Sequence, residues 1–198
     1  MYAYKRTIDV VGASLGLLLA LPFFAVIGPA IKLTSKGPVF YRGPRIGRNG
    51  KPFRIFKFRT MVVDADQIGG HSTALNDPRL TAIGKILRRY KLDEIPQFLN
   101  VLKGEMSLVG PRPQVEHYTK RYTGEEAIIL SVPPGLTDYA SLHFINMDST
   151  LGNADVDRKY VDEVEPLKNR LRIQYVKEQS FVTDMKILLK TVARIFQA

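Results

Sequence analysis

The hydrophobic pattern is dominated by one continuous apolar stretch, residues 10–31, which carries no charged side chain over 22 positions. At about 1.5 Å per residue, a helix of this length measures roughly 33 Å, close to the hydrocarbon core of a bilayer. Lys5 and Arg6 precede the stretch, and Lys32 and Lys36 follow it. Because basic flanks favour the cytoplasmic side, a straight crossing would leave one basic flank outside. The pattern therefore predicts that residues 1–34 form a re-entrant membrane helix that enters and returns, with a plain transmembrane span as the alternative.

Pro22 lies in the middle of this stretch and is the predicted membrane break. A proline inside a helix removes one backbone hydrogen bond and clashes with the preceding turn, which costs about 3 kcal/mol and bends the helix. A cleavable signal peptide is a weaker interpretation, because the apolar run is long and no small-x-small cleavage site follows it. We expect the remaining residues, 35–198, to form one domain on the cytoplasmic face of the membrane.

Residues 39–58 alternate between strand-like apolar positions and basic ones. Asn49-Gly50 is a strong signal for a two-residue turn between two strands. Eight Lys or Arg and no acid lie between Ser35 and Thr60. This pattern predicts a basic β-hairpin, which beside a membrane helix is expected to contact anionic lipid headgroups.

Helical spacing returns in residues 81–104, which read as two helices with a joint between them. Pro96 suits the first turn of the second helix, and Gly104 suits its end. Near the C-terminus, residues 181–195 place apolar side chains along one helical stripe, with Lys186, Lys190 and Arg194 beside them. This last helix either packs on its own domain or lies at the membrane interface as an amphipathic helix.

The charge of the chain is strongly asymmetric. The formal net charge is +10, and eleven Lys or Arg against one acid lie before residue 62, whereas acids and bases balance in the remainder. This asymmetry indicates an anionic surface or substrate near the N-terminal third. Basic residues interleaved with aromatic ones also suit nucleic acid, but no nucleic-acid-binding motif accompanies them, so we expect no nucleic-acid partner. The absence of cysteine excludes disulfides and thiolate metal sites.

Two adjacent acids, Asp93 and Glu94, stand just before Pro96 in the joint between the predicted helices. One interpretation is structural, because acids near a helix start stabilise it by a few tenths to about 1 kcal/mol. The other is catalytic. Arg88 lies upstream and Arg112 follows in a Gly-Pro-Arg-Pro turn, and such a basic surrounding is expected to lower the pKa of both acids and keep them ionised. An ionised carboxylate can attack phosphorus, and a diphosphate substrate needs its charge neutralised by Mg²⁺ and arginines.

Three stretches closely resemble the monotopic bacterial phosphoglycosyl transferases: KRTIDVVGASLGLLLALP, KLTSKGPVFYRGPRIGRNGKPFRIFKFRTM and LRRYKLDEIPQFLNVLKGEMSLVGPRP. The match runs in order from residue 5 to about residue 113, with a weaker echo in VPPGLT. The resemblance implies a mixed α/β fold and an enzyme that moves a sugar 1-phosphate from a UDP-sugar to a membrane polyprenol (undecaprenyl) phosphate, releasing UMP. It also implies Mg²⁺ and an aspartyl-phosphosugar intermediate.

Carried over residue by residue, the resemblance implies that Asp93 is the nucleophile and that Glu94 shares metal binding with it. Arg59, Arg88 and Arg112 would hold phosphates or the nucleotide, and Lys57 is a further candidate for binding a phosphate. The resemblance places the catalytic domain on the cytoplasmic face of the bacterial inner membrane.

This sequence departs from the family pattern at two places. Leu21 stands before Pro22 where relatives commonly have Ser, and residues 138–144 (DYASLHF) replace the usual continuation after PGLT. The second departure leaves the identity of the sugar open. The rival to an enzyme is a non-catalytic membrane-attached adaptor whose basic hairpin binds anionic lipid.

Overall fold

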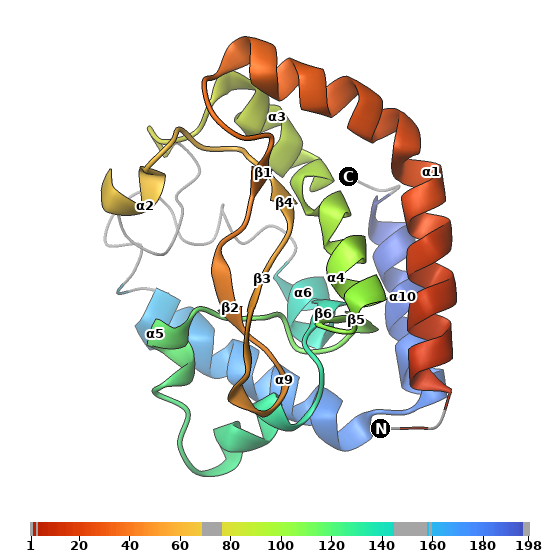
Figure 1. Ribbon diagram of the computed structural model, residues 1–198. Helices are drawn as coiled ribbons and strands as arrows, with labels where there is room; N and C mark the ends of the chain where they lie inside the picture. The colour runs from red at the N-terminus through yellow and green to blue at the C-terminus, as the bar shows by residue number, and fades with distance from the viewer. Residues whose placement is uncertain (1, 3, 69–76, 145–157, 159, 196–198) are drawn as a thin grey trace.

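The computed structural model describes residues 2, 4–68, 77–144, 158 and 160–195, and their architecture is mixed, mostly helical with small sheets (Figure 1). The mixed α/β class predicted from the sequence is confirmed. In chain order, the elements are α1 (Lys5–Thr34), β1 (Phe40–Tyr41), β2 (Pro44–Ile46), a 3-10 turn (Arg48–Gly50), β3 (Pro52–Arg54), β4 (Lys57–Phe58), α2 (Ala65–Ile68), α3 (Ala82–Arg89), a 3-10 helix (Leu92–Gln97), α4 (Phe98–Lys103), β5 (Ser107–Val109), α5 (Glu116–Thr119), a 3-10 helix (Gly124–Ser131), β6 (Gly135–Thr137), α6 (Tyr139–His143), a π-helical turn (Tyr160–Val164), α9 (Glu165–Glu178) and α10 (Phe181–Ile195).

The strands of the basic segment form two successive antiparallel pairs along one long ribbon. β1 pairs with β4, and β2 pairs with β3. The expected two-residue turn at Asn49-Gly50 is instead a five-residue connection, residues 47–51, because the pairing ends at Ile46 and Pro52. Asn49 and Gly50 have positive φ angles of 56° and 74°, so they still provide the left-handed backbone that reverses the chain.

The apolar stretch is one continuous helix, α1, with Pro22 and Pro29 inside it. Figure 1 shows this helix bent near its middle, so that its first half rises along one side of the molecule and its second half runs across the top. By length and hydropathy it could cross a membrane, and only 17% of its most apolar 18-residue window is buried in the protein. A bend in the part of the helix that contains Pro22 is the effect expected of an internal proline.

Both halves of α1 pack against the rest of the chain. Ala13 belongs to the main core cluster with Val101, whereas Ile27 and Ile31 join Phe58 in a second cluster. The two ends are also held by side chains: Arg6 donates to the carbonyls of α4, and Arg59 donates to the backbone just after α1. Because both ends are fixed to one body, α1 lies along the face of the domain.

The packing of α3 depends on one place where its backbone lies very close to the backbone of another segment. Thr81 caps α3 by accepting a hydrogen bond from the backbone N–H of Gly84 at 3.0 Å. A Cβ atom on Gly84 would lie 1.9 Å from the carbonyl oxygen of Thr60. α3 can therefore pack on the strand ribbon only with glycine at this position.

We expect Gly84→Ala to lower the free energy of unfolding by roughly 1–3 kcal/mol, because the backbone must move apart to admit the methyl group. Gly28→Ala is the matched control, since its Cβ would meet only Val39 at an ordinary 3.9 Å. Chemical denaturation of both variants in the same detergent checks this prediction. Equal stabilities for the two variants would contradict it.

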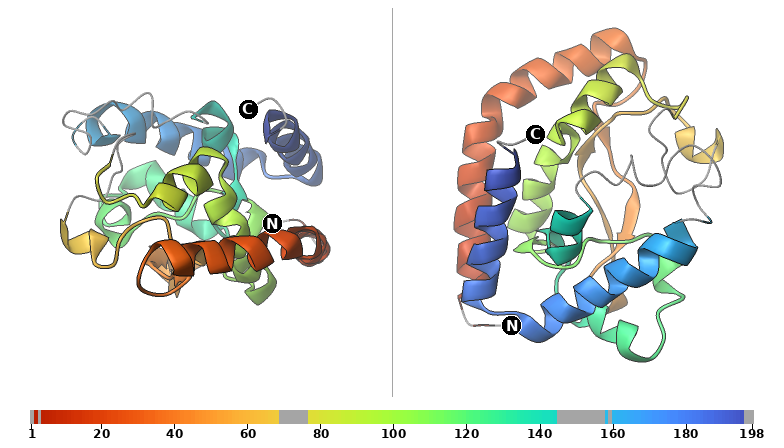
Figure 2. Two further views of the ribbon diagram at one scale, coloured as in Figure 1. Left: turned by 90° about the horizontal axis from the view of Figure 1, so that it is seen from above. Right: turned by 180° about the vertical axis from the view of Figure 1, so that it is seen from behind.

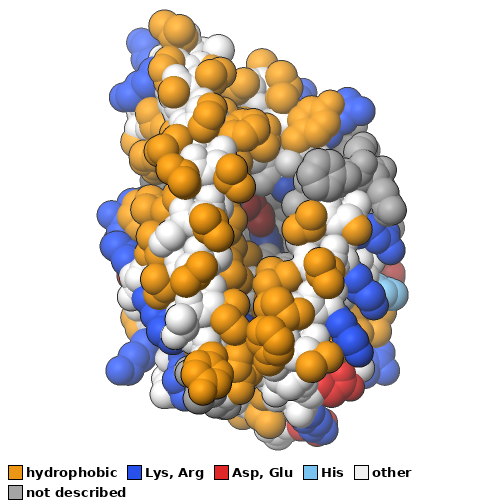
Figure 3. Space-filling view, turned by 90° about the vertical axis from the view of Figure 1, so that its right-hand side faces the viewer, with side chains coloured by type: hydrophobic (Ala, Val, Ile, Leu, Met, Phe, Trp, Pro, Cys, Tyr) orange, Lys and Arg blue, Asp and Glu red, His pale blue; other side chains and the backbone are white. Residues whose placement is uncertain are grey.

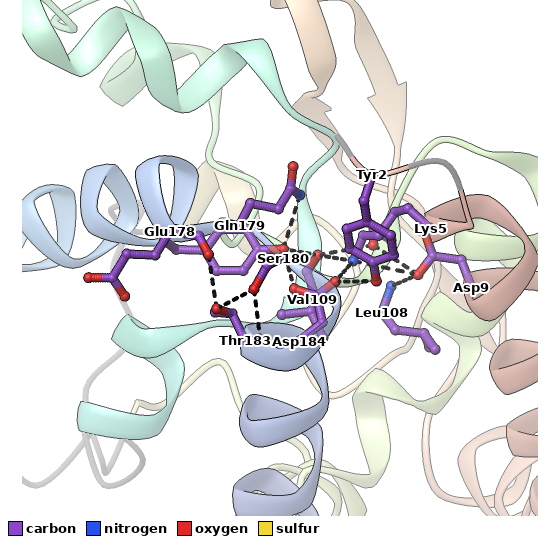
Figure 4. A network of polar contacts seen from close by, with 12 residues as sticks. Tyr2, Lys5, Asp9, Leu108, Val109, Glu178, Gln179, Ser180, Thr183 and Asp184 are labelled. Atoms are coloured by element: carbon purple, nitrogen blue, oxygen red, sulfur yellow. Dashed lines mark hydrogen bonds and ion pairs between the residues drawn. The ribbon is translucent and has the colours of Figure 1, made fainter.

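A buried polar network ties the start of α1 to α10 (Figure 4). Lys5 Nζ contacts Asp184 Oδ2 at 2.5 Å and donates to the carbonyl of Val109 at 2.9 Å. Tyr175 of α9 donates to Asp184 Oδ1 at 2.9 Å. One turn further along α1, Asp9 accepts hydrogen bonds from Ser107 and the backbone of Leu108. Lys5, expected as a basic flank of the membrane segment, is instead buried within the domain.

The face formed by α1 and α10 is apolar on its outside. Figures 1 and 2 show α10 lying beside the first half of α1, and Figure 3 shows apolar side chains covering both helices. The exposed large apolar residues of the two helices include Val11, Leu15, Leu18, Leu19, Leu21 and Val26 of α1 and Phe181, Val182, Leu189 and Val192 of α10. The other side of α10 packs inward through Ile187, so its two predicted roles, packing and an exposed apolar surface, fall on different faces of one helix.

Candidate active site

The acid pair lies in a short 3-10 helix between α3 and α4. Lys91 opens this helix in the left-handed conformation, with a φ angle of 55°. No side-chain cap hydrogen bond forms at its start or at the start of α4, which begins only at Phe98. Both acids lie in the first turn of the 3-10 helix, so the structural interpretation, that acids near a helix start stabilise it, stands beside the catalytic one. Gly104 does end α4, with a φ angle of 81°.

Glu94 is bound on both oxygens by basic side chains. Arg112 holds it in a two-pronged contact, with Nη1 donating to Oε2 at 3.0 Å and Nη2 donating to Oε1. Lys57 of β4 donates to Oε1 at 2.8 Å. A guanidinium that donates two hydrogen bonds to one carboxylate holds it in a defined geometry and compensates its charge. Glu94 is therefore held in one position with its negative charge compensated.

Asp93 is more deeply buried, at 4% exposure, and is more loosely paired. Its Oδ2 lies 3.7 Å from Lys57 Nζ, beyond hydrogen-bond length. Lys57 therefore bridges the two acids but is bonded mainly to Glu94.

The two pKa values move in opposite directions. Burial raises the pKa of Asp93 above its ordinary value, and the attraction of Lys57 only partly offsets this effect. Burial would also raise the pKa of Glu94, but Arg112 and Lys57 outweigh it and hold that pKa well below its ordinary range. The prediction of a low pKa is thus right for Glu94 and wrong for Asp93, because Glu94 takes the closest cations and adds its own negative charge beside Asp93.

The candidate arginines lie in three different environments. Arg112 contacts the acid pair directly. Arg88 of α3 lies near enough to lower the pKa of Asp93, while its Nε donates to Thr60 Oγ1 at 3.1 Å. Arg59 is buried, and the hydrogen bonds resolved for it go to Ser35 and the carbonyl of Lys36. Arg59 therefore binds the end of α1 in this structure, and its role toward a phosphate stays a prediction.

The Arg112 turn is positioned by a second glycine contact. β5 and β6 pair in parallel, with Val109 opposite Thr137. A Cβ atom on Gly135 would lie 2.1 Å from the backbone nitrogen of Gly110. This close approach joins the Gly-Pro-Arg-Pro turn to the distant Pro-Pro-Gly-Leu-Thr segment.

A cavity of about 430 Å³ opens beside the pair, and Glu94 and Arg112 line it. Its polar end also contains Lys91, Lys168 and Arg172. Its apolar wall is formed by Ile95, Phe98, Leu108, Leu136, Leu142, Leu188 and Val192. Figure 3 shows a recess between the two apolar columns of α1 and α10, with acidic and basic atoms at its bottom. The site thus combines paired charged side chains with an apolar cavity wall.

The family model for bacterial sugar transferases matches residues 1–198. The chain belongs to the bacterial sugar transferase family. It is 40% identical over 196 residues to the UDP-glucose:undecaprenyl-phosphate glucose-1-phosphate transferase of Escherichia coli, covering 97% of this chain and 40% of that protein. It is 36% identical over 206 residues to the exopolysaccharide production protein ExoY of Rhizobium meliloti, covering 96% and 84% respectively.

A third relative carries a different sugar in its name. The UDP-N-acetylgalactosamine-undecaprenyl-phosphate N-acetylgalactosaminephosphotransferase of Aeromonas hydrophila is 33% identical over 199 residues, covering 98% of this chain and 44% of that protein. The chain thus spans less than half the length of the Escherichia coli and Aeromonas relatives. Membership of the family leaves the sugar open.

The family departure in residues 138–144 forms part of the cavity wall. Asp138 caps α6 by accepting from the backbone N–H of Ser141 at 2.7 Å. Ser141, Leu142 and Phe144 of the same segment line the cavity. A change of sequence here therefore changes the surface that a ligand in the cavity would meet.

Lys168 and Arg172 of α9 line the cavity, and the sequence pattern did not single them out. Lys168 is 6% exposed, and burial, with help from Arg172 and Arg112, lowers its pKa to about 7 despite the opposing charge of Asp138. Its ammonium lies 5.3 Å from the centre of the Phe144 ring. Lys168 and Arg172 both lie far from the acid motif in sequence, so no local spacing of residues could have indicated them.

The donor set of the acid pair fits Mg²⁺ as the family resemblance implies it. Mg²⁺ takes one or two protein carboxylates and completes its shell with water and substrate phosphates. Asp93 and Glu94 offer such hard oxygen ligands side by side, and in the described part of the chain no cluster of three acids or histidines offers a fuller site. Lys57 lies between the two carboxylates and would have to yield to a cation.

Proposed function

We propose that this chain transfers a sugar 1-phosphate from a UDP-sugar to a membrane polyprenol phosphate of the undecaprenyl type, producing UMP and a polyprenyl diphosphate sugar. The observation that carries the proposal is the acid pair bound to Lys57 and Arg112 beside a half-apolar cavity. Undecaprenyl phosphate and UDP-sugars stand in the names of the relatives. This reaction is a first membrane step in building bacterial polysaccharides.

In the first step, an Asp93 carboxylate oxygen attacks the phosphorus that bears the sugar. The new bond is an acyl phosphate, and the bond to the oxygen bridging the two phosphates breaks. UMP leaves with that oxygen and its electron pair. Asp93 is the better nucleophile of the pair, because Arg112 and Lys57 occupy both oxygens of Glu94, and because its raised pKa marks a more basic carboxylate.

In the second step, an oxygen of the polyprenol phosphate attacks the same phosphorus. The acyl phosphate bond breaks, Asp93 regains its carboxylate, and the lipid leaves as a diphosphate sugar. The two-pronged contact between Glu94 and Arg112 keeps the charges of these two side chains in the same positions in both steps. Mg²⁺ held by Asp93 and Glu94 would neutralise phosphate charge when bound.

The domain lies on the cytoplasmic face of the bacterial inner membrane in this proposal, with α1 as a re-entrant helix. Both ends of α1 are bound to one body, and its outer face is apolar. A straight span cannot return to the same face of a domain that stays on one side of the bilayer. The UDP-sugar then arrives from the cytoplasm, and the acceptor from the membrane, which confines it near the site.

Release of UMP tests the proposal. Purified full-length chain in detergent or lipid is incubated with Mg²⁺, polyprenol phosphate and each of a panel of UDP-sugars. Acceptor-dependent UMP release from at least one donor, lost with chelator, supports the proposal and names the sugar. No release from any donor by folded protein that still binds anionic vesicles would favour the lipid-binding adaptor.

We expect kcat/KM for the UDP-sugar to fall as pH rises through about 7, because Lys168 loses its proton near that value and with it its attraction for phosphate. A lysine is charged below its pKa, so the stronger binding lies on the acid side. Lys168→Arg keeps the charge at all these pH values and should flatten the profile, whereas Lys168→Gln should raise KM about tenfold at pH 6. Identical pH profiles for wild type and Lys168→Arg would contradict this role.

A further inference from the structure

The cavity beside the acid pair is lined by two chemically different groups of residues. Glu94, Arg112 and Lys168 are charged, whereas Leu136, Leu188 and Val192 are apolar. Figure 3 shows charged atoms at the bottom of the recess and apolar side chains around its opening. At about 430 Å³ it has the size of a small-molecule site. A ligand that fits both ends carries negative charge at one end and hydrocarbon at the other.

The apolar end is built mainly by α10 and by residues that pack under α1. Phe98 and Leu108 reach the cavity where α1 passes over them, and α1 has glycine at both crossings: a Cβ on Gly12 would lie 2.5 Å from Leu108, and one on Gly16 would lie 2.7 Å from Phe98. Thr191 of α10 is joined to Thr137 of β6 by a 2.8 Å hydrogen bond between their hydroxyls. The two helices are therefore fixed on either side of the recess seen in Figure 3.

The outer surfaces of α1 and α10 continue the apolar wall to the outside. Val192 both lines the cavity and is 51% exposed, so it lies at the mouth. Leu189, one turn earlier, is 71% exposed but does not line the cavity. Lys186, Lys190 and Arg194 are exposed on the same helix, as expected of a helix in a headgroup layer. The mouth therefore faces the same apolar environment as α1.

We infer that the groove between α1 and α10 is the entry track for the isoprenoid chain of the lipid acceptor, with Val192 at its mouth and Leu188 and Leu136 along its wall. The inference rests on the proposed function and adds to it the place where the acceptor binds. The phosphate of the acceptor lies toward Arg112 and Lys168, and the first isoprene units lie against the apolar wall. The rest of a long chain cannot fit in this volume and stays in the bilayer.

The charge and shape of the groove select this occupant. A polyprenol phosphate carries one hydrocarbon chain directly on its phosphate, which matches a single apolar wall that leads to basic side chains. A two-chain phospholipid presents a glycerol branch between phosphate and hydrocarbon. A second copy of the protein would present helices, and it would leave the basic end of the cavity without an anion.

The test compares Val192→Trp with Leu189→Trp. Both changes keep α10 apolar and exposed, but only the first fills the mouth of the cavity. We expect Val192→Trp to raise KM for a long-chain polyprenol phosphate about tenfold or more, with KM for the UDP-sugar within about twofold of wild type. Leu189→Trp should behave as wild type. An unchanged acceptor KM in Val192→Trp, or an equal rise in both variants, overturns the inference.

A second measurement is independent of catalysis. An isoprenoid phosphate with a photoreactive group within its first isoprene units is irradiated with the wild-type protein in phosphatidylethanolamine–phosphatidylglycerol vesicles, and labelled peptides are mapped. Labelling within residues 181–195, competed by unreactive isoprenoid phosphate but not by added phosphatidylglycerol, supports the track. Labelling elsewhere, or equal competition by the phospholipid, overturns it. Failure of the proposed function would differ, since no wild-type transfer would occur with any donor.

Discussion

Asp93→Asn is expected to abolish sugar-phosphate transfer, with kcat lowered roughly 10³-fold or more, as for the loss of other enzyme nucleophiles. The amide has the size of the carboxylate but cannot form the acyl phosphate bond. Because Asp93 makes no hydrogen bond to Lys57 and Glu94 keeps its own, we expect the fold to survive the change. UMP release at saturating donor and acceptor measures the effect.

Glu94→Gln is the matched control, because it removes the neighbouring charge and keeps the shape. Arg112 and Lys57 would lose their anionic partner, so we expect a loss of about 10²-fold, typical of one electrostatic group in an active site. A complete loss in Glu94→Gln with activity retained in Asp93→Asn would make Glu94, which lines the cavity, the nucleophile instead. Thermal unfolding of both variants separates lost chemistry from lost structure.

Asp184→Asn is expected to lower the free energy of unfolding by about 3 kcal/mol, because it removes the nearer of the two carboxylates that pair with the buried ammonium of Lys5 and leaves only Asp9, at 3.9 Å. Asp184 is 1% exposed and accepts from Lys5, Tyr2 and Tyr175 (Figure 4). The amide nitrogen of the introduced asparagine would face one of these hydrogen-bond donors and could not accept from it. The start of α1 should then detach from α10, which limited proteolysis near the N-terminus would detect.

A double-mutant cycle isolates this interaction. Lys5→Met with Asp184→Leu removes both charges of this ion pair and leaves Asp9 with its hydrogen bonds from Ser107 and Leu108, so it should recover part of the stability lost by either change alone. Urea denaturation of the four proteins in one detergent measures the coupling. Additive effects of the two single changes, with no recovery in the double variant, would contradict the account.

The chemistry of the site could be predicted from short stretches of sequence because its central residues are local. Asp93, Glu94 and Arg112 lie within twenty positions of one another, and the turn chemistry of the segment brings them together. The sequence named Lys57 as a candidate for binding a phosphate; in the structure it donates to Glu94, and its role toward a phosphate stays a prediction. The end of α4 at Gly104 followed from glycine's tolerance of a positive φ angle.

The parts that sequence reasoning missed are set by burial and by long-range contacts. The raised pKa of Asp93 depends on its depth in the protein, which no local charge pattern reveals. Lys168 reaches the cavity from α9, and Lys5 finds Asp184 across 179 positions. Arg59 lies in the basic run that suggested a phosphate-binding role, but its side chain binds the backbone at the end of α1.

The apolar stripe of α10 shows the same limit of prediction from sequence. Periodicity placed Phe181 and Val192 on one apolar stripe and left open whether that stripe packs inward or faces a membrane; both are exposed, whereas the buried positions include Asp184 and Ile187. An apolar helix between a core and a membrane has two apolar faces, so its hydrophobic period cannot tell which face is inside. Polar contacts at Asp184, bound to Lys5, and at Thr191, bound to Thr137, fix the rotation of the helix.

The mass of the intact protein after incubation with its UDP-sugar, Mg²⁺ and no acceptor tests the covalent role of Asp93 most directly. The sample is quenched in acid, where acyl phosphates survive briefly, and then digested to locate the added mass. The account predicts an increase equal to one sugar phosphate on the peptide that contains Asp93, absent in Asp93→Asn and removed by adding polyprenol phosphate. Active enzyme that forms lipid product but never carries this mass, or carries it on another residue, would contradict the account.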